Sequence, residues 1–318
     1  MLEAFPPLGR FRARLGSRLL EVPQQLGAGR VFAKCELDNP TATVKDRVAC
    51  AMLWRLLQTE GAAPDMHVLE YSGGTLAVPL ARLCAELGIT AHLVLSSGSD
   101  PSLLAQLREV GADVELVDKT LGFYAVMERA MAISRANPRW KFLYQHENQA
   151  NVHMHETTTG QEILAQLPVK RVDAWLGSVG TGGSLIGVYR ALSKVYPEVA
   201  MYATTPAELP YGSPEPANGK PKFAGSGGLG NGIRQPFVQP YDALVRRHIP
   251  YPYPDTLGLM RQFHAETGMW IGSSAAANLH AARGLAAELG PDSVVVTLFP
   301  SAGTPEEQAR AIATGVAS

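Results

Sequence analysis

The sequence is poor in cysteine, carries almost no net charge and lacks long apolar runs. It has three cysteines, Cys35, Cys50 and Cys84, among 318 residues, with no C-x-x-C spacing. This sparse, odd set argues against a disulfide framework or a zinc site and favours small buried side chains in a reducing compartment. The formal net charge of -1 gives no reason to expect a nucleic-acid or membrane-surface partner.

Two further absences concern location. No stretch reaches the ~18 consecutive apolar residues of a membrane span. The first ten residues, Met1 to Arg10, do not contain the apolar segment of a secretory signal. We therefore expect a cytoplasmic protein.

What is present indicates a globular α/β protein. The 46% hydrophobic content allows a sizeable core, and at roughly 150 residues per domain the length suggests about two domains. Short apolar runs alternate with amphipathic segments, which favours largely parallel sheets. The expected strands cover residues 31–37, 67–71, 90–95, 114–117, 141–145, 174–176, 200–204 and 293–299. Helices are expected at 44–57, at 123–135, at 184–195 and, as the last one, at 274–289. Two more are expected between these, one that ends at residue 87 and one that begins at residue 101.

Sheets of this kind bind ligands at the carboxyl ends of their strands, where the glycine- and serine-rich turns of this sequence lie. The Gly- and Pro-rich stretch 206–240 is too long for a simple turn and predicts a functional or disordered loop.

One lysine stands at a predicted helix start. The segment from Thr43 to Asp46 has capping-box form, which predicts Thr43 as the N-cap and Lys45 as the second helical residue. The positive end of the helix dipole and desolvation both lower the pKa of a lysine there. A neutral amine is what Schiff-base formation with an aldehyde requires. On position alone, a solvated surface lysine remains the more ordinary explanation.

A glycine loop at 177–184 follows a predicted strand and opens a helix. Backbone N–H groups and a helix N-terminus favour an anion at such a place. The loop is not a P-loop, and it lacks the G-x-G-x-x-G pattern with a distant acid that marks dinucleotide binding. Its pattern alone indicates a phosphate site, a dinucleotide site or a purely structural turn.

The segment K-C-E-L-D-N-P-T-A-T-V-K-D-R, from Lys34 to Arg47, resembles the lysine segment of the cysteine synthase family. That pyridoxal-phosphate-dependent family, which includes cystathionine β-synthase and serine/threonine dehydratases, has the approximate pattern K-x-E-x-x-N-P-x-x-S-x-K-x-R, and Thr43 replaces its Ser. The resemblance implies fold type II, tryptophan synthase β-like: two three-layer α/β/α domains with mostly parallel sheets and pyridoxal 5'-phosphate in the cleft between them. It implies that Lys45 forms the Schiff base and later moves protons at the substrate Cα.

The resemblance also divides the chain. It implies a smaller mobile α/β domain at 38–146, and a larger α/β domain from 1–37 and 147–318 that carries the phosphate loop. It further implies a homodimer.

Two other segments resemble cofactor-binding motifs of the family. The 177–184 loop is similar to G-x-G-T-G-G-[TS], which assigns the cofactor phosphate to Gly180, Thr181, Gly182, Gly183 and Ser184. The segment 272–276 resembles S-S-G-A, which assigns the ring nitrogen to Ser273, although an ordinary serine N-cap would also explain it. A neutral partner of this kind leaves the ring nitrogen largely unprotonated.

The substrate loop departs from the family. Residues 70–77 align with E-x-T-S-G-N-T-G, which implies substrate binding by Ser72, Gly73, Gly74 and Thr75, together with Gln145. Thr75 stands for the Asn that binds the cofactor's phenolic oxygen. Leu76 supplies no hydroxyl and adds apolar bulk, and Ala77 replaces Gly. These changes leave the identity of the substrate open.

Several ionisable residues nearby allow two explanations. His146 and Glu147 follow Gln145 directly; both ionise or form hydrogen bonds, and His146 is expected to titrate near neutral pH. They either read an unusual substrate or nucleophile or are surface polar residues. His153 and His155 lie two apart, a spacing that suits a metal only on a strand and with further ligands, so no metal is predicted.

The sequence thus predicts a pyridoxal-phosphate-dependent transferase of amino-acid biosynthesis. The expected reaction is β-replacement on an O-activated serine-type amino acid via aminoacrylate, giving cysteine or a related β-substituted alanine. A β-elimination lyase and a non-catalytic binding protein on the same fold remain alternatives. The expected partners are a small amino acid and a small nucleophile, neither of which the sequence names.

Overall fold

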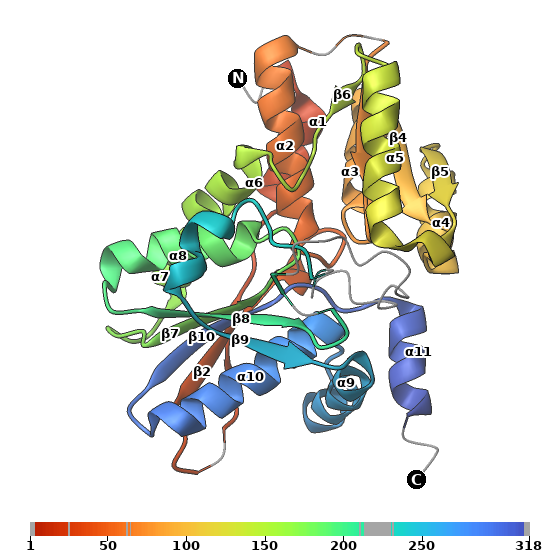
Figure 1. The fold of residues 1–318 in the computed structure, drawn as a ribbon. Helices are drawn as coiled ribbons and strands as arrows, with labels where there is room; N and C mark the ends of the chain where they lie inside the picture. Colours follow the sequence, from red (N-terminus) through yellow and green to blue (C-terminus); the bar gives the residue numbers. More distant parts are fainter. Residues whose placement is uncertain are drawn as a thin grey trace.

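The computed structural model of the protein describes residues 4–24, 26–61, 63, 65–209, 211–212, 230 and 232–314. Within these ranges the strands form two sheets, one of six strands and one of four. Figure 1 shows the four-stranded sheet in the upper half of the molecule and the six-stranded sheet in the lower half. We call these halves the small lobe and the large lobe.

The sheet of the large lobe combines strands from both ends of the chain. In the described structure its order is β1-β2-β10-β7-β8-β9, and only the β1–β2 pair is antiparallel. The bounds are β1 Leu19–Val22, β2 Arg30–Cys35, β7 Ala174–Ser178, β8 Ala200–Pro206, β9 Val245–Tyr251 and β10 Val294–Phe299. Every residue of β10 is buried, as expected for a largely apolar parallel strand that is covered on both faces.

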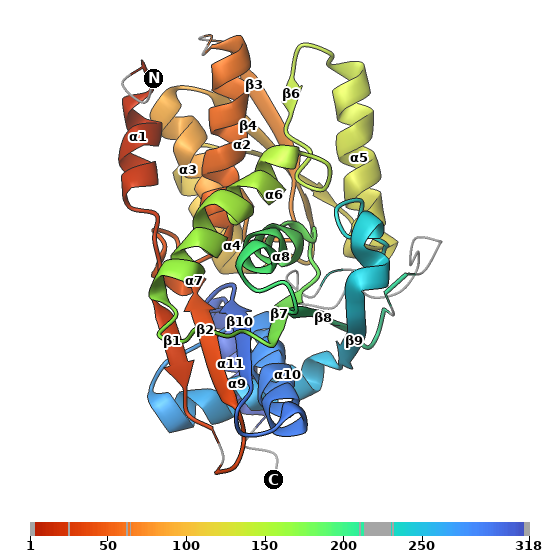
Figure 2. The ribbon, with the colours of Figure 1, turned by 90° about the vertical axis from the view of Figure 1, so that its left-hand side faces the viewer.

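Helices cover both faces of this sheet. One hydrophobic core packs α9 and α10 against it, and another packs α8 with α7 against the opposite face. In Figure 1, α7 and α8 lie above the sheet and α9 and α10 below it. The bounds are α6 Gln149–Met154, α7 Gly160–Gln166, α8 Gly183–Val195, α9 Tyr253–Thr267, α10 Ser273–Leu289 and α11 Pro305–Ala313. Figure 2 shows α6 rising from the large lobe beside α2 (Lys45–Glu60) of the small lobe.

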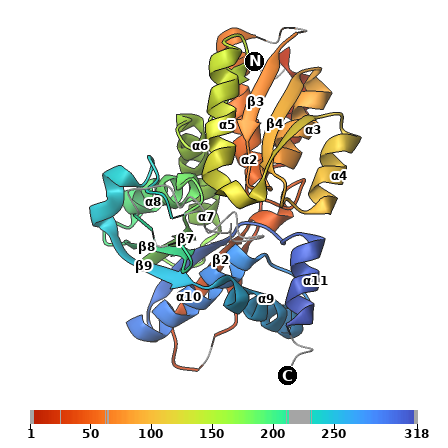
Figure 3. The ribbon, with the colours of Figure 1, turned by 45° about the vertical axis from the view of Figure 1, so that its right-hand side comes forward.

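The small lobe has the same three-layer form. Its sheet has the order β5-β4-β3-β6 with parallel neighbours, namely β3 His67–Tyr71, β4 Thr90–Ser96, β5 Asp113–Val117 and β6 Lys141–Phe142. Figure 3 shows this sheet between α5 on one side and α3 and α4 on the other. The bounds are α1 Pro6–Ala13, α2 Lys45–Glu60, α3 Ala77–Leu87, α4 Pro101–Glu109 and α5 Gly122–Ala136. The predicted α/β fold of two three-layer units is confirmed.

Some predicted elements were wrong in extent or missing. The strand predicted at 31–37 ends at Cys35, because Glu36–Asp38 form a 3-10 turn (η2), and the strand predicted at 141–145 ends at Phe142. The helix at 274–289 is not the last, since α11 follows β10. Neither β9 nor α9 was predicted. Most of the 206–240 loop lies outside the described residues.

Two further expectations concern the division into domains and the absence of a membrane span. The strands of the small sheet all lie within 38–146 and those of the large sheet outside it, but the domain bounds themselves stay a prediction. Among the described helices, none combines the length and the apolar character needed to span a bilayer.

The fold brings four loops to one region. The carboxyl ends of β3, β4, β7 and β10 lead into the loops that begin at Ser72, Ser97, Val179 and Pro300. In an α/β fold this edge of a parallel sheet is where ligands bind. The start of α2 joins this region, because the Val44 N–H donates to the Pro300 carbonyl at 2.7 Å.

Candidate active site

Lys45 is the first residue of α2, one position earlier in the helix than predicted. Val44 is the N-cap residue, and the Thr43 hydroxyl accepts a longer hydrogen bond from the Lys45 N–H at 3.3 Å. The Asp46 carboxylate reaches back to the backbone N–H of Thr43, as the predicted box requires, and it also accepts the Thr41 N–H at 2.7 Å. The prediction of Thr43 as N-cap was therefore wrong by one residue, while the prediction of a lysine at the helix start is confirmed.

The arginine of the lysine segment is a buried anchor between the lobes. Arg47 is 1% exposed. Its Nε donates to Glu36 Oε2 at 2.7 Å, and its two terminal nitrogens donate to the Glu162 carboxylate at 2.6 and 2.7 Å. Because Arg47 lies two residues after Lys45, this bidentate pair fixes the helix start against α7 of the large lobe.

The other polar residues of the segment complete the same network. Lys34 is fully buried, and its ammonium group pairs with Glu162 at 2.8 Å and donates to Gln166 at 3.0 Å. Asn39 donates to the Glu36 carbonyl at 2.9 Å. Most polar residues of the segment therefore support the turn that presents Lys45, and Lys45 itself is left to face the cavity.

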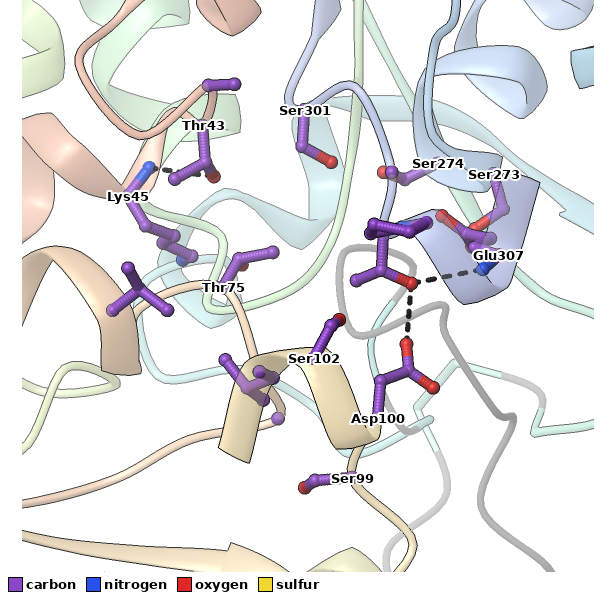
Figure 4. Close-up of a pocket in the computed structure, with 18 of the residues that line it drawn as sticks. Thr43, Lys45, Thr75, Ser99, Asp100, Ser102, Ser273, Ser274, Ser301 and Glu307 are labelled. Carbon is purple, nitrogen blue, oxygen red and sulfur yellow. Dashed lines mark hydrogen bonds between the residues drawn. The ribbon is translucent and has the colours of Figure 1, made fainter. Parts of the chain in front are cut away.

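Lys45 opens onto a cavity of about 730 Å³ between the lobes. Figure 4 shows Lys45 and Thr75 at one end of this cavity and Ser273 and Glu307 at the other. Both lobes line it. The predicted site residues among its walls are Lys45, Gly73, Gly74, Thr75 and Ser273.

Burial makes the Lys45 amine easier to deprotonate. Removal from water lowers the pKa of Lys45 to about 8, a shift that the nearby Glu70 carboxylate partly offsets. Burial likewise raises the pKa of Glu70 to about 8, against the effect of the Tyr71 and Gln145 N–H groups that it accepts. A useful fraction of Lys45 is therefore a neutral amine near neutral pH, as nucleophilic attack on an aldehyde requires.

The loop after β3 places its backbone at the cavity wall. The Ser72 hydroxyl accepts the Gly74 N–H at 3.0 Å, and the Thr75 side chain is exposed in the cavity. Leu76 is 1% exposed and packs in the core of the small lobe. The expectation that Leu76 adds apolar bulk at the site was wrong, because α3 begins at Ala77 and turns Leu76 inward.

Asn151, to which the sequence assigned no binding role, joins the loops of the two lobes. Its amide nitrogen donates to the Gln145 carbonyl and to the Thr181 hydroxyl, both at 3.0 Å. The Gln145 amide in turn donates to the Tyr71 carbonyl at 2.9 Å. This chain of hydrogen bonds ties the end of β3 to the glycine loop. The side-chain amide of Gln145 is itself engaged in it, through the bond to the Tyr71 carbonyl.

The glycine loop fits a phosphate. Gly182 has φ 84° and is the N-cap of α8, and a Cβ there would lie 2.4 Å from Val238 Cγ2. A Cβ on Gly183 would lie 2.2 Å from Asn151 Oδ1. That buried oxygen has no hydrogen-bond partner among the described residues. Because glycines stand there, the space at this helix N-terminus is not filled by side chains, and an oxyanion can approach its backbone N–H groups. In the described part of the chain, Gly180 to Ser184 do not line the cavity at Lys45.

Ser273 begins α10, with Gly272 rather than a serine as its N-cap residue, and is 1% exposed. Beside it lies Glu307 of α11, a buried acid that no sequence pattern indicated because α11 itself was not predicted. Burial raises the pKa of Glu307 to about 7, while the hydroxyl and N–H of Ser273 act in the opposite direction.

His146 is not the group titrating near neutral pH that the sequence indicated. His146 is buried, its ring stacks on Tyr71 at a centroid distance of 5.3 Å, and burial lowers its pKa to about 3. It therefore stays neutral near pH 7, contrary to the sequence expectation, whereas Glu147 is exposed. His153 is exposed and His155 is buried against Thr159. Among the described residues no three His, Cys, Asp or Glu side chains are grouped so that they could hold a metal ion.

Comparison with known proteins adds independent findings. Residues 15–301 match the family described as pyridoxal-phosphate dependent enzyme. A cysteine synthase of Staphylococcus aureus is 31% identical over 277 residues, which is 87% of each chain. A probable cysteine synthase of Bacillus subtilis is 29% identical over 284 residues, which is 88% of this chain and 89% of the relative.

Solved structures share the fold. O-acetyl serine sulfhydrylase isoform 3 of Entamoeba histolytica superposes with a TM-score of 0.81 at 22% identity, covering 95% of this chain and 94% of its own. An O-ureido-L-serine synthase superposes with a TM-score of 0.79 at 23% identity, covering 93% and 92%.

Proposed function

Because the chain belongs to the family of pyridoxal-phosphate-dependent enzymes, we propose that it catalyses β-replacement on an O-activated serine-type amino acid, as in cysteine synthesis. The observation that carries this proposal is Lys45, a lysine of lowered pKa at a helix start that opens into the cavity between the lobes. Its cysteine synthase relatives favour replacement over other reactions of the family.

The residues present suit the cofactor. We assign its phosphate to the backbone and hydroxyls of Gly180, Thr181, Gly182, Gly183 and Ser184. Its ring nitrogen is assigned to Ser273, its phenolic oxygen to Thr75 and its aldehyde carbon to Lys45. When bound, pyridoxal phosphate supplies an electron sink for charge that develops at the substrate Cα.

The chain's own groups then perform the proton transfers. With pyridoxal phosphate bound, the neutral Lys45 amine would hold its aldehyde carbon, and the same amine would be the base that accepts the proton from the substrate Cα. Its pKa of about 8 lets it accept and return that proton near neutral pH. Glu70, close enough to influence this pKa, favours the protonated amine after the transfer.

We assign the substrate carboxylate to the start of α3. Gly73, Gly74 and Thr75 line the cavity at this helix N-terminus, where backbone N–H groups favour an anion. Ser72, whose hydroxyl accepts the Gly74 N–H, holds the loop in shape. Gln145 supports the same loop through the Tyr71 carbonyl.

The proposal is tested with purified protein and pyridoxal phosphate. O-acetylserine, O-phosphoserine, serine and cysteine are added in turn, with and without sulfide, and the products are analysed by mass spectrometry. A β-substituted alanine that forms only with an added nucleophile, and not with Lys45→Ala, supports replacement. Pyruvate released at the same rate with or without nucleophile indicates a lyase instead, and cofactor binding without turnover of any donor indicates a binding protein.

We further propose that the protein works as a cytoplasmic homodimer with a small amino acid and a small nucleophile as its substrates. The free, buried state of all three cysteines suits a reducing compartment. Light scattering of the purified holoenzyme tests the dimer, since a mass of about one chain under assay conditions would contradict it.

A further inference from the structure

Glu307 is a buried acid on the wall of the cavity. It lies in the first turn of α11, where its N–H donates to the N-cap hydroxyl of Thr304 at 3.1 Å. The residue is only 2% exposed, yet it lines the same cavity as Lys45. Figure 4 shows it beside Ser273 at the far end of the cavity from Lys45.

The loop before α11 makes room for this carboxylate. A Cβ on Gly303 would lie 2.7 Å from Glu307 Oε2 and 3.1 Å from the Gly272 Cα. A glycine at 303 therefore lets α11 approach the start of α10 closely enough for an acid to reach Ser273. Since φ at Gly303 is also positive, at 79°, two independent features require glycine there.

The carboxylate has an unused acceptor position. Glu307 Oε1 is buried and has no hydrogen-bond partner among the described residues. The hydroxyl and the N–H of Ser273 stabilise the charged form of Glu307, as does Arg310, whereas Asp100 opposes it. Asp100 is itself engaged, accepting the Thr304 hydroxyl at 2.6 Å. A buried oxygen without a donor is costly, so a hydrogen from a neighbouring hydroxyl is the expected partner.

We propose that Glu307 is a positioning residue that acts through Ser273 on the ring nitrogen of bound pyridoxal phosphate and keeps that nitrogen protonated. This inference rests on the proposed function. A serine hydroxyl has one hydrogen. If Ser273 donates it to Glu307, the Ser273 oxygen can only accept toward the cofactor, and a ring nitrogen that faces an acceptor must carry the proton itself.

This arrangement reverses the sequence expectation for Ser273. A serine alone leaves the ring nitrogen largely unprotonated, whereas a serine backed by a carboxylate favours the pyridinium form, which is the stronger electron sink. Positive charge on the ring nitrogen in turn favours the ionised form of Glu307. The acid and the protonated ring therefore stabilise each other across Ser273.

The test is the ¹⁵N NMR shift of the ring nitrogen in holoenzyme loaded with ring-¹⁵N pyridoxal phosphate. We expect a pyridinium shift in the wild type, a change to the unprotonated pyridine range in Glu307→Gln, and return toward pyridinium in Glu307→Asp. The matched control is Glu306→Gln, an acid in the same helix turn that binds Ser102 and not Ser273; its spectrum should stay that of the wild type. An unprotonated shift in the wild type, or no change in Glu307→Gln, overturns the inference.

Ser273→Ala gives a second test that does not depend on the folding of a Glu307 variant. It keeps the acid but removes the link, so the pyridinium signal should be lost; a pyridinium signal that survives shows that Ser273 is not the link and overturns the inference. Protein that binds no pyridoxal phosphate overturns the proposed function as well. Protein that binds the cofactor on Lys45 with an unprotonated ring overturns only the role of Glu307.

Discussion

Replacing Arg47 with methionine should destabilise the protein far more than removing an exposed arginine of similar geometry. The Arg47 guanidinium pairs with Glu36, which is fully buried, and with Glu162, whose side chain is 27% exposed. Methionine fills much of the same space but leaves Glu36 without its counter-charge.

The magnitude follows from burial. Removing one partner of a buried ion pair costs about 3–5 kcal/mol. Glu36 keeps hydrogen bonds from the Ser17 hydroxyl at 2.9 Å and from the Asn39 amide, and Glu162 can take up water. We therefore expect a loss of about 3 kcal/mol in the free energy of unfolding for Arg47→Met, at the lower end of that range.

The control is Arg30→Met. Arg30 binds Glu21 through two nitrogens at 2.7 and 2.9 Å, but the two side chains are 43% and 48% exposed. Exposed pairs contribute about 0–1 kcal/mol. Urea unfolding followed by circular dichroism compares the variants at pH 7. Equal losses for Arg47→Met and Arg30→Met would refute the claim that the polar residues of the lysine segment form a structural anchor.

Three further predictions concern the cavity and its surroundings. Gly183→Ala should weaken pyridoxal phosphate binding at least tenfold in a fluorescence titration, because its Cβ would lie 2.2 Å from Asn151 Oδ1. The control Gly258→Ala, with open space around its Cβ, should leave the affinity unchanged. Equal effects of the two substitutions would contradict the assignment of the cofactor phosphate to the glycine loop. Ser102→Ala removes the 2.7 Å bond by which the small lobe reaches Glu306 of the large lobe. Losing about 1 kcal/mol of the interaction that holds the two lobes together over the cavity should raise the KM of the amino-acid substrate roughly fivefold while the unfolding midpoint hardly moves. An unchanged KM would contradict a role of this bond in holding the lobes together around the substrate. Burial lowers the pKa of His146 to about 3 from 6.5, so the stabilisation by its neutral form is complete above pH 6.5 and is lost as the pH falls toward 3. The unfolding free energy of His146→Asn should therefore fall less steeply than that of the wild type between pH 6.5 and 4. Parallel curves of unfolding free energy against pH would refute a neutral buried His146.

Much of the fold could be predicted because its strands are buried on both faces. β3, β4 and β10 are largely apolar and buried along nearly their whole length, and their bounds agree with the prediction to within a residue. β9 was missed because it is an edge strand, with two exposed arginines and Pro250 in it, a composition that such a position tolerates. The family, the α/β fold and the cofactor predicted from the sequence are confirmed.

The site could be predicted only where a local pattern carries the chemistry. The position of Lys45 at a helix start follows from its own segment. Glu307 could not be predicted, because its role depends on the approach of α11 to α10 and not on any motif around it. The inward turn of Leu76 and the burial of His146 likewise depend on tertiary packing. The binding roles assigned to the other site residues stay predictions.

The most direct test of the account is the residue to which the cofactor becomes attached. Protein purified with pyridoxal phosphate is reduced with borohydride, digested and mapped by mass spectrometry. The account predicts a pyridoxyl group on Lys45 and none after Lys45→Ala. Attachment to another lysine, such as the buried Lys34, or no attachment at all, would contradict it.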